Sequence, residues 1–139
     1  MSTATTTLTR SHPTTATTWS LRRTTLVVGL AASAVVAGIA AVLHAVGVSF
    51  DVHGDIPIAA FAQMTFLGAI AGGVIAAVLK RRSVDPARRF VQVAVALTAL
   101  SCIPSVAMPH GVATKLALVT THLVAAAVIV PVLARKLDA

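Results

Sequence analysis

Four polar side chains interrupt long apolar runs of the sequence and could carry chemistry inside a membrane. They are His44, Gln63, Ser101 and His122, and each lies near one end of its run. If the runs are helices that cross a bilayer, all four side chains lie roughly 6–10 Å below the same boundary. Ionisable residues are rare at such depth, and imidazole can hold a metal, a haem iron or a proton. One interpretation is therefore that these residues form a cofactor-binding layer for a metal, a haem, a quinone-like headgroup or a proton in transit.

The same layer has a purely structural interpretation, in which its side chains hydrogen-bond to neighbouring helices. His44 and His122 would then be neutral imidazoles. The polar groups that join helices, at about 0.6 kcal/mol per pair, would be Gln63, Thr65, Ser101 and Thr121. Satisfied buried polar groups are common, so for any single residue this role is the more frequent one. A bis-histidine haem would also require the two imidazoles to lie on facing helices, which equal depth alone does not establish.

Four further potential ligands lie in the two segments beyond the same ends of the runs: Asp51, His53, Asp55 and His110. The Asp-x-His-x-Asp spacing supplies oxygen and nitrogen ligands for a divalent metal, with His110 as the candidate fourth ligand. The alternative is a solvated turn marked by Gly54 and Pro57, and this reading is favoured because three ligands in one loop are weakly specific.

Several enzymatic motifs are absent from the sequence. No Asp or Glu falls inside an apolar run, although an exporter that exchanges protons for drugs needs a membrane-embedded carboxylate. Walker, Gly-x-Ser-x-Gly, His-Glu-x-x-His and Cys-x-x-Cys motifs are missing, and Cys102 is the single cysteine. We therefore favour a protein that is not an enzyme.

The elements that must position these residues follow from the hydropathy of the chain. Hydrophobic residues make up 57% of the 139 positions, and the mean hydropathy is +0.91, which is typical of an integral membrane protein. Each apolar run is close to the roughly 20 residues that a helix needs to cross the hydrocarbon layer. The runs cover residues 26–48, 58–79, 90–107 and 116–134.

The predicted fold is all-α: a four-helix transmembrane bundle within residues 21–139, in which consecutive spans run antiparallel. Residues 1–20 are rich in threonine and serine, so we predict a disordered tail. Small residues at every fourth position predict helix contacts, either within the bundle or in a homodimer. These stripes are Gly29, Ser33 and Ala37 in the first run and Gly68, Gly72 and Ala76 in the second.

Charge predicts the orientation of the bundle. The chain has 11 Lys and Arg residues against 4 Asp and Glu, and all the basic residues except Lys115 fall on one side of a four-span arrangement. Basic loops face the cytoplasm, so both termini are predicted to be cytoplasmic in a multi-pass protein of the cell membrane. Because the basic clusters border apolar runs, anionic lipid headgroups are the expected partners and nucleic acid is not.

Two short segments carry a resemblance to a known family. Leu100-Ser101-Cys102-Ile103-Pro104 lies in the third run, and Thr121-His122-Leu123-Val124 leads to Ile129-Val130-Pro131 in the fourth. With the basic loop between the second and third runs, these segments make residues 22–133 resemble small four-span actinobacterial membrane proteins that are defined only as a domain of unknown function. The resemblance makes His122 the first choice for a functional residue and implies no reaction, substrate or cofactor.

Two functions remain open from the sequence. The first is a non-enzymatic interaction or structural module of the membrane that associates with itself or with another membrane protein, as the small-residue stripes suggest. The second is a ligand-, metal- or haem-binding component of a membrane redox or transport system that uses the polar layer.

Overall fold

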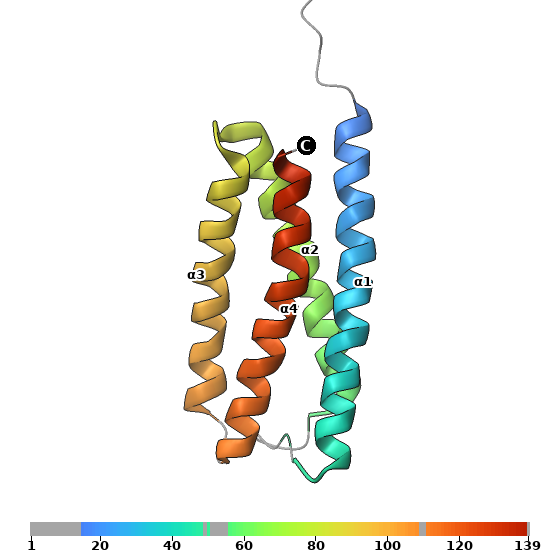
Figure 1. Cartoon of the computed structure of the whole chain (residues 1–139), viewed down its shortest axis with the longest axis vertical. Helices are drawn as coiled ribbons and strands as arrows, with labels where there is room; N and C mark the ends of the chain where they lie inside the picture. The colour runs from blue at the N-terminus through green and yellow to red at the C-terminus, as the bar shows by residue number, and fades with distance from the viewer. Residues whose placement is uncertain (1–14, 49, 51–55, 109–110, 139) are drawn as a thin grey trace, which may run out of the picture.

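Four helices form an antiparallel bundle (Figure 1). The computed structural model of the chain describes residues 15–48, 50, 56–108 and 111–138. No strand occurs in those residues, so the predicted all-α four-helix fold is confirmed. The helices are α1 (Thr15–Ala45), α2 (Ile58–Arg82), α3 (Pro86–Ala107) and α4 (Val112–Asp138).

All four helices are long and apolar enough to cross a membrane, as the sequence predicted. The shortest, α3, has 22 residues, which at ~1.5 Å per residue gives about 33 Å of helix. Large aliphatic side chains such as Val27, Leu67 and Leu100 are exposed on the outside of the bundle. A surface of this kind is stable against lipid, and the protein is therefore a small multi-pass membrane protein.

The basic end of each helix extends beyond its apolar run, whereas α1 ends at Ala45, inside the predicted run 26–48. Local hydrogen bonding and capping, rather than hydropathy, decide where a helix starts and stops. The turn between α2 and α3 shows this. The Ser83 amide donates to the Leu79 carbonyl at 2.9 Å and closes α2. Asp85 caps α3 by accepting a hydrogen bond from the Arg88 amide at 3.2 Å, and Pro86 occupies the first turn. Near the N-terminus, α1 begins at Thr15, inside the range 1–20 that was predicted as a disordered tail. Residues 1–14 lie outside the described part of the chain.

Basic side chains gather at one end of the bundle. Figure 1 shows the start of α1, the connection from α2 to α3, and the end of α4 at the same end. Among the Lys and Arg residues that the structure describes, only Lys115 lies at the opposite end. At the basic end, the Lys80 ammonium donates to the Lys136 carbonyl at 3.4 Å and so joins α2 to the last turn of α4.

The tightest helix contact lies between α1 and α2, but its small residues differ from the predicted stripe. A Cβ atom added at Gly29 would lie 2.9 Å from the Ala69 Cβ, and one added at Gly73 would lie 2.6 Å from the Thr25 Oγ1. The buried stripe of α2 is therefore Ala69, Gly73 and Ala76, rather than Gly68, Gly72 and Ala76. One residue corresponds to about 100° of rotation around a helix, so a shift by one position selects a different face.

An aromatic group closes the end of the bundle opposite the basic clusters. Phe50 lies in the connection after α1 and is only 1% exposed. Its ring packs edge-on against Phe61 of α2, with centroids 4.8 Å apart. Together with Val36 and Leu118, these rings form a core cluster that joins α1, α2 and α4.

Candidate functional site

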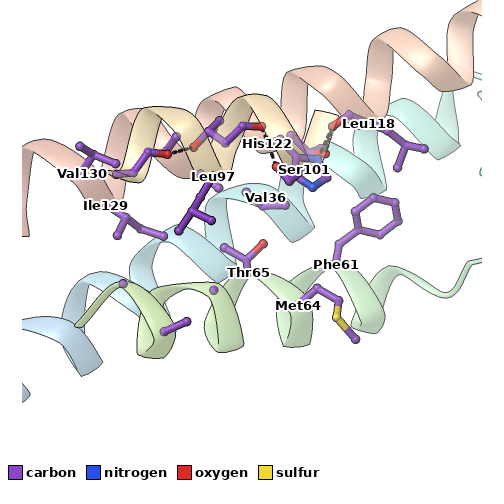
Figure 2. Close-up of a pocket in the computed structure, with 18 of the residues that line it drawn as sticks. Val36, Phe61, Met64, Thr65, Leu97, Ser101, Leu118, His122, Ile129 and Val130 are labelled. Atoms are coloured by element: carbon purple, nitrogen blue, oxygen red, sulfur yellow. Dashed lines mark hydrogen bonds between the residues drawn. The ribbon is translucent and has the colours of Figure 1, made fainter. Parts of the chain in front are cut away.

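A cavity of about 550 Å³ lies between α2, α3 and α4, and Val36 of α1 also lines it (Figure 2). It extends along the bundle from Ile56 and Phe61 to Ile75 and Phe90 near the basic end. Its position follows from the packing, because α1 packs mainly on α2, and α3 packs mainly on α4, whereas α2 and α3 meet less closely. The cavity is the space that remains between the α1–α2 pair and the α3–α4 pair.

Two glycines keep this space open. A Cβ atom added at Gly68 would have no atom within 4 Å, and one added at Gly72 would meet only the Leu133 Cδ1, at 3.7 Å. Both glycines line the cavity. The predicted packing stripe of α2 therefore forms a wall of the cavity instead, and the neighbouring residues carry the helix contact.

The cavity lining is apolar apart from a band of hydroxyl groups and one imidazole. The band comprises Thr65 of α2, Thr98 and Ser101 of α3, and Thr121 and His122 of α4. If the roughly 30 Å of hydrocarbon is measured from the basic end of each helix, Thr65, Ser101 and His122 lie about 8–12 Å below the opposite boundary. An apolar chamber with a few convergent polar groups is the usual form of a small-molecule site.

Most polar hydrogens of this band are bound to the backbone of their own helix. The His122 Nδ1 lies 2.8 Å from the Leu118 carbonyl oxygen, to which Thr121 Oγ1 also donates at 2.8 Å. On α3, Ser101 Oγ donates to the Thr98 carbonyl at 2.8 Å, and the Thr98 hydroxyl donates to the Ala94 carbonyl, one turn earlier, also at 2.8 Å. Such bonds fix the side-chain rotamers and leave lone pairs directed away from the backbone.

The four predicted cofactor-binding residues are not all brought together. Ser101 and His122 line the same cavity from facing helices, whereas His44 and Gln63 are exposed and do not line it. Gln63 lies two positions before Thr65, so it is on the far side of α2. His44 lies in the last turn of α1, with its ring nearly parallel to that of Phe50 and the centroids 6.5 Å apart. The two histidines therefore do not share this cavity, and cofactor binding at the four residues stays a prediction.

The predicted metal ligands Asp51, His53, Asp55 and His110 lie outside the described residues. Within the described part of the chain, no group of three His, Cys, Asp or Glu side chains could hold a metal ion. Metal binding at the two loops therefore stays a prediction. Cys102 is half-buried next to the band and does not line the cavity.

Thr98 and the two open glycines belong to the site and were not predicted as part of it. Thr98 precedes Ser101 by three positions, which places both hydroxyls on one face of α3. That spacing was visible in the sequence. The role of Gly68 and Gly72 was not, because glycines at every fourth position are equally compatible with a helix contact and with an open groove.

A second, shallower hollow lies between α1 and α4 at the basic end. Its polar side comprises Ser20, Arg23 and Thr24, and its apolar side includes Val28 and Val132. The Thr24 hydroxyl donates to the Ser20 carbonyl at 2.9 Å. The hollow therefore presents an exposed guanidinium above an aliphatic surface.

Residues 14–139 match the Family of unknown function (DUF6069), and the protein therefore belongs to that family. The resemblance to a family of unknown function is confirmed at this level, and the family specifies no reaction, substrate or cofactor. No curated protein sequence and no solved structure matches the chain.

Proposed function

We propose that this DUF6069 protein is a non-enzymatic membrane protein that binds an apolar molecule from the bilayer in the cavity between α2, α3 and α4. The observation that supports the proposal is the cavity itself: about 550 Å³, apolar in most of its lining, with one polar band. Volumes of roughly 300–1,000 Å³ with few polar groups are typical of sites for small molecules. Well-packed protein interiors contain few voids larger than a water molecule, so a space of this size favours an occupant.

The mouth of the cavity faces the region that the helices present to lipid. Met64 of α2 and Leu97 of α3 line the cavity and are 66% and 47% exposed, so they flank its opening. Both lie within the apolar part of their helices. A molecule dissolved in the bilayer can therefore enter sideways between α2 and α3 without crossing water, which would favour an apolar ligand over a water-soluble one.

Filling the cavity tests the proposal. In a Gly68→Leu variant, the new isobutyl group would occupy the cavity without meeting a neighbouring atom at its Cβ. Gly38→Leu is the matched control, because Gly38 of α1 has equally open space at its Cβ and does not line the cavity. Native mass spectrometry of protein from its own membrane should find an apolar molecule on the wild type and on Gly38→Leu, and not on Gly68→Leu. A molecule retained by Gly68→Leu, or none on the wild type, contradicts the proposal.

We further propose that the basic end of the bundle faces the cytoplasm and lies against anionic headgroups of the cell membrane. The charge asymmetry supports this orientation, since the described basic residues except Lys115 gather at one end. The hollow that contains Arg23 lies at this end, above aliphatic residues that match a lipid chain.

Self-association is a second candidate function, supported by the exposure of α3. Only Ala87, Phe90 and Ser105 of this helix are buried. A second copy, or another membrane protein, could cover the exposed face and the mouth of the cavity. Single-molecule photobleaching in lipid nanodiscs distinguishes the candidates: a uniform monomer that retains a small molecule contradicts self-association, and a dimer without a bound molecule supports it.

A further inference from the structure

The hydrogen bond of His122 determines what its free nitrogen can do. A carbonyl oxygen can only accept, so Nδ1, which lies 2.8 Å from the Leu118 carbonyl, carries the hydrogen. In a neutral imidazole the other nitrogen, Nε2, is then an acceptor. His122 is half-buried and lines the cavity (Figure 2). The imidazole can therefore accept a hydrogen bond from a molecule in the cavity and cannot donate one.

Three of the four hydroxyl groups in the band can likewise only accept a hydrogen bond from a molecule in the cavity. Thr98, Ser101 and Thr121 each give their only hydroxyl hydrogen to a backbone carbonyl of their own helix. Their oxygens can still accept a hydrogen bond. Thr65 is different, because its hydroxyl makes no hydrogen bond to any other residue that the structure describes. Figure 2 shows this hydroxyl directed from α2 into the space below α3 and α4. The band thus combines several acceptors with one group that can donate.

We propose that the occupant of the cavity is an uncharged apolar molecule that carries a hydroxyl group, which donates to the His122 Nε2 and accepts from the Thr65 hydroxyl. The inference rests on the proposed function and specifies its ligand. A ketone, ester or ether could accept from Thr65 but has no hydrogen for Nε2. An amine would carry a positive charge into a lining without a carboxylate, where burial of an unpaired ion is strongly unfavourable.

The position of the band excludes ordinary phospholipids as well. Apolar residues line the cavity on both sides of the band, with Phe61 and Leu118 toward one end and Ile129 and Phe90 toward the other. His122 lies about 10 Å inside the hydrocarbon layer, whereas a phosphate headgroup stays at the surface. A ligand hydroxyl at this depth has no water to compete with, so pairing at His122 contributes directly to selectivity.

Paired probes test this chemistry in lipid nanodiscs. Geranylgeraniol and its methyl ether differ by one hydrogen-bond donor, and so do an alkylphenol with a single hydroxyl group and its methyl ether. In the wild type, each hydroxyl compound should bind about tenfold more tightly than its ether, as expected for one hydrogen bond made without competing water. The pair that binds more tightly distinguishes an aliphatic alcohol from a phenol as the source of the hydroxyl.

Two variants separate the roles of the two side chains. His122→Phe keeps a ring in the cavity without an acceptor nitrogen, so the affinities for alcohol and ether should become equal. Thr65→Val removes the donor that both probes use, so it should weaken both equally and preserve their ratio. This second variant keeps the test decisive if His122→Phe fails to fold.

The outcomes distinguish the inference from the function on which it rests. Equal affinities of the wild type for alcohol and ether, or a preference that persists in His122→Phe, overturn the inference. The proposed function survives that result if Gly68→Leu still loses the bound molecule. Failure of all four probes to bind, together with a Gly68→Leu variant that behaves as the Gly38→Leu control, overturns both.

Discussion

Replacing Gly73 with alanine tests the contact that joins α1 to α2. The added methyl group would meet Thr25 of α1, with the Oγ1 at 2.6 Å and the Cβ at 3.0 Å. Thr25 cannot turn away freely, because it is buried and its hydroxyl donates to the Leu21 carbonyl at 2.9 Å. Either α1 must move away from α2, or Thr25 must change its rotamer and give up this hydrogen bond.

The expected cost follows from two opposing effects. Alanine in place of a helix-interior glycine favours the helix by about 0.5–1 kcal/mol. Overpacking of a close contact costs about 1–3 kcal/mol, and a lost buried hydrogen bond costs about 1 kcal/mol. We therefore expect Gly73→Ala to lower the free energy of unfolding by about 2 kcal/mol, which is about 30-fold in the folding equilibrium.

Reversible unfolding in mixed micelles, followed by circular dichroism, measures this loss. Gly38→Ala is the matched control, since its new methyl group meets no atom within 4 Å, and it should be neutral or slightly stabilising. In a Thr25→Ala background, Gly73→Ala should cost less than about 1 kcal/mol, because the clashing Oγ1 and Cγ2 are gone. Equal stabilities of Gly73→Ala and Gly38→Ala in the wild-type background would refute the close approach of α1 and α2.

Three further predictions concern the ends of the bundle. Phe50→Ala should cost about 3–5 kcal/mol in unfolding experiments, because its buried ring packs on Phe61, and an unchanged midpoint would show that the ring is not buried. Asp85→Ala should cost about 0.5–2 kcal/mol through loss of the α3 cap, whereas Asp85→Asn should be nearly neutral. In a cysteine-free background, a membrane-impermeant maleimide added to intact cells should label Lys115→Cys and not Lys136→Cys. Labelling of Lys136→Cys and not of Lys115→Cys would show that the orientation is opposite to the one proposed.

The helices were predictable because the information for them is local. Four apolar runs of sufficient length predict four spans, and the structure contains four helices that can cross a membrane. Their ends were less accurate, since capping by Asp85 and helical continuation into basic segments extend α2, α3 and α4 past the apolar residues. Hydropathy indicates which part of a helix lies in the hydrocarbon layer, whereas the helix itself ends where its backbone hydrogen bonds end.

The site was predicted only in part. Ser101 and His122 lie in one cavity, while Gln63 and His44 lie elsewhere on their helices. Depth along a helix can be counted from the sequence at ~1.5 Å per residue, and the depths of Ser101 and His122 agree. The direction in which a side chain points requires the rotation of each helix about its axis, and the sequence does not contain that rotation in readable form.

The sequence by itself determined that the protein lies in a bilayer, how many helices it has and at which end its basic residues gather. Each of these properties follows from the length, hydropathy or charge of a single segment. Only the tertiary structure decided that Ala69 and Gly73 meet α1 while Gly68 and Gly72 open a cavity toward His122. The physical reason is that lipid is as apolar as the interior of the bundle, so these helices carry no polar face that marks their outside. Steric fit between neighbouring helices then sets the rotation, and that fit exists only once the helices are packed together.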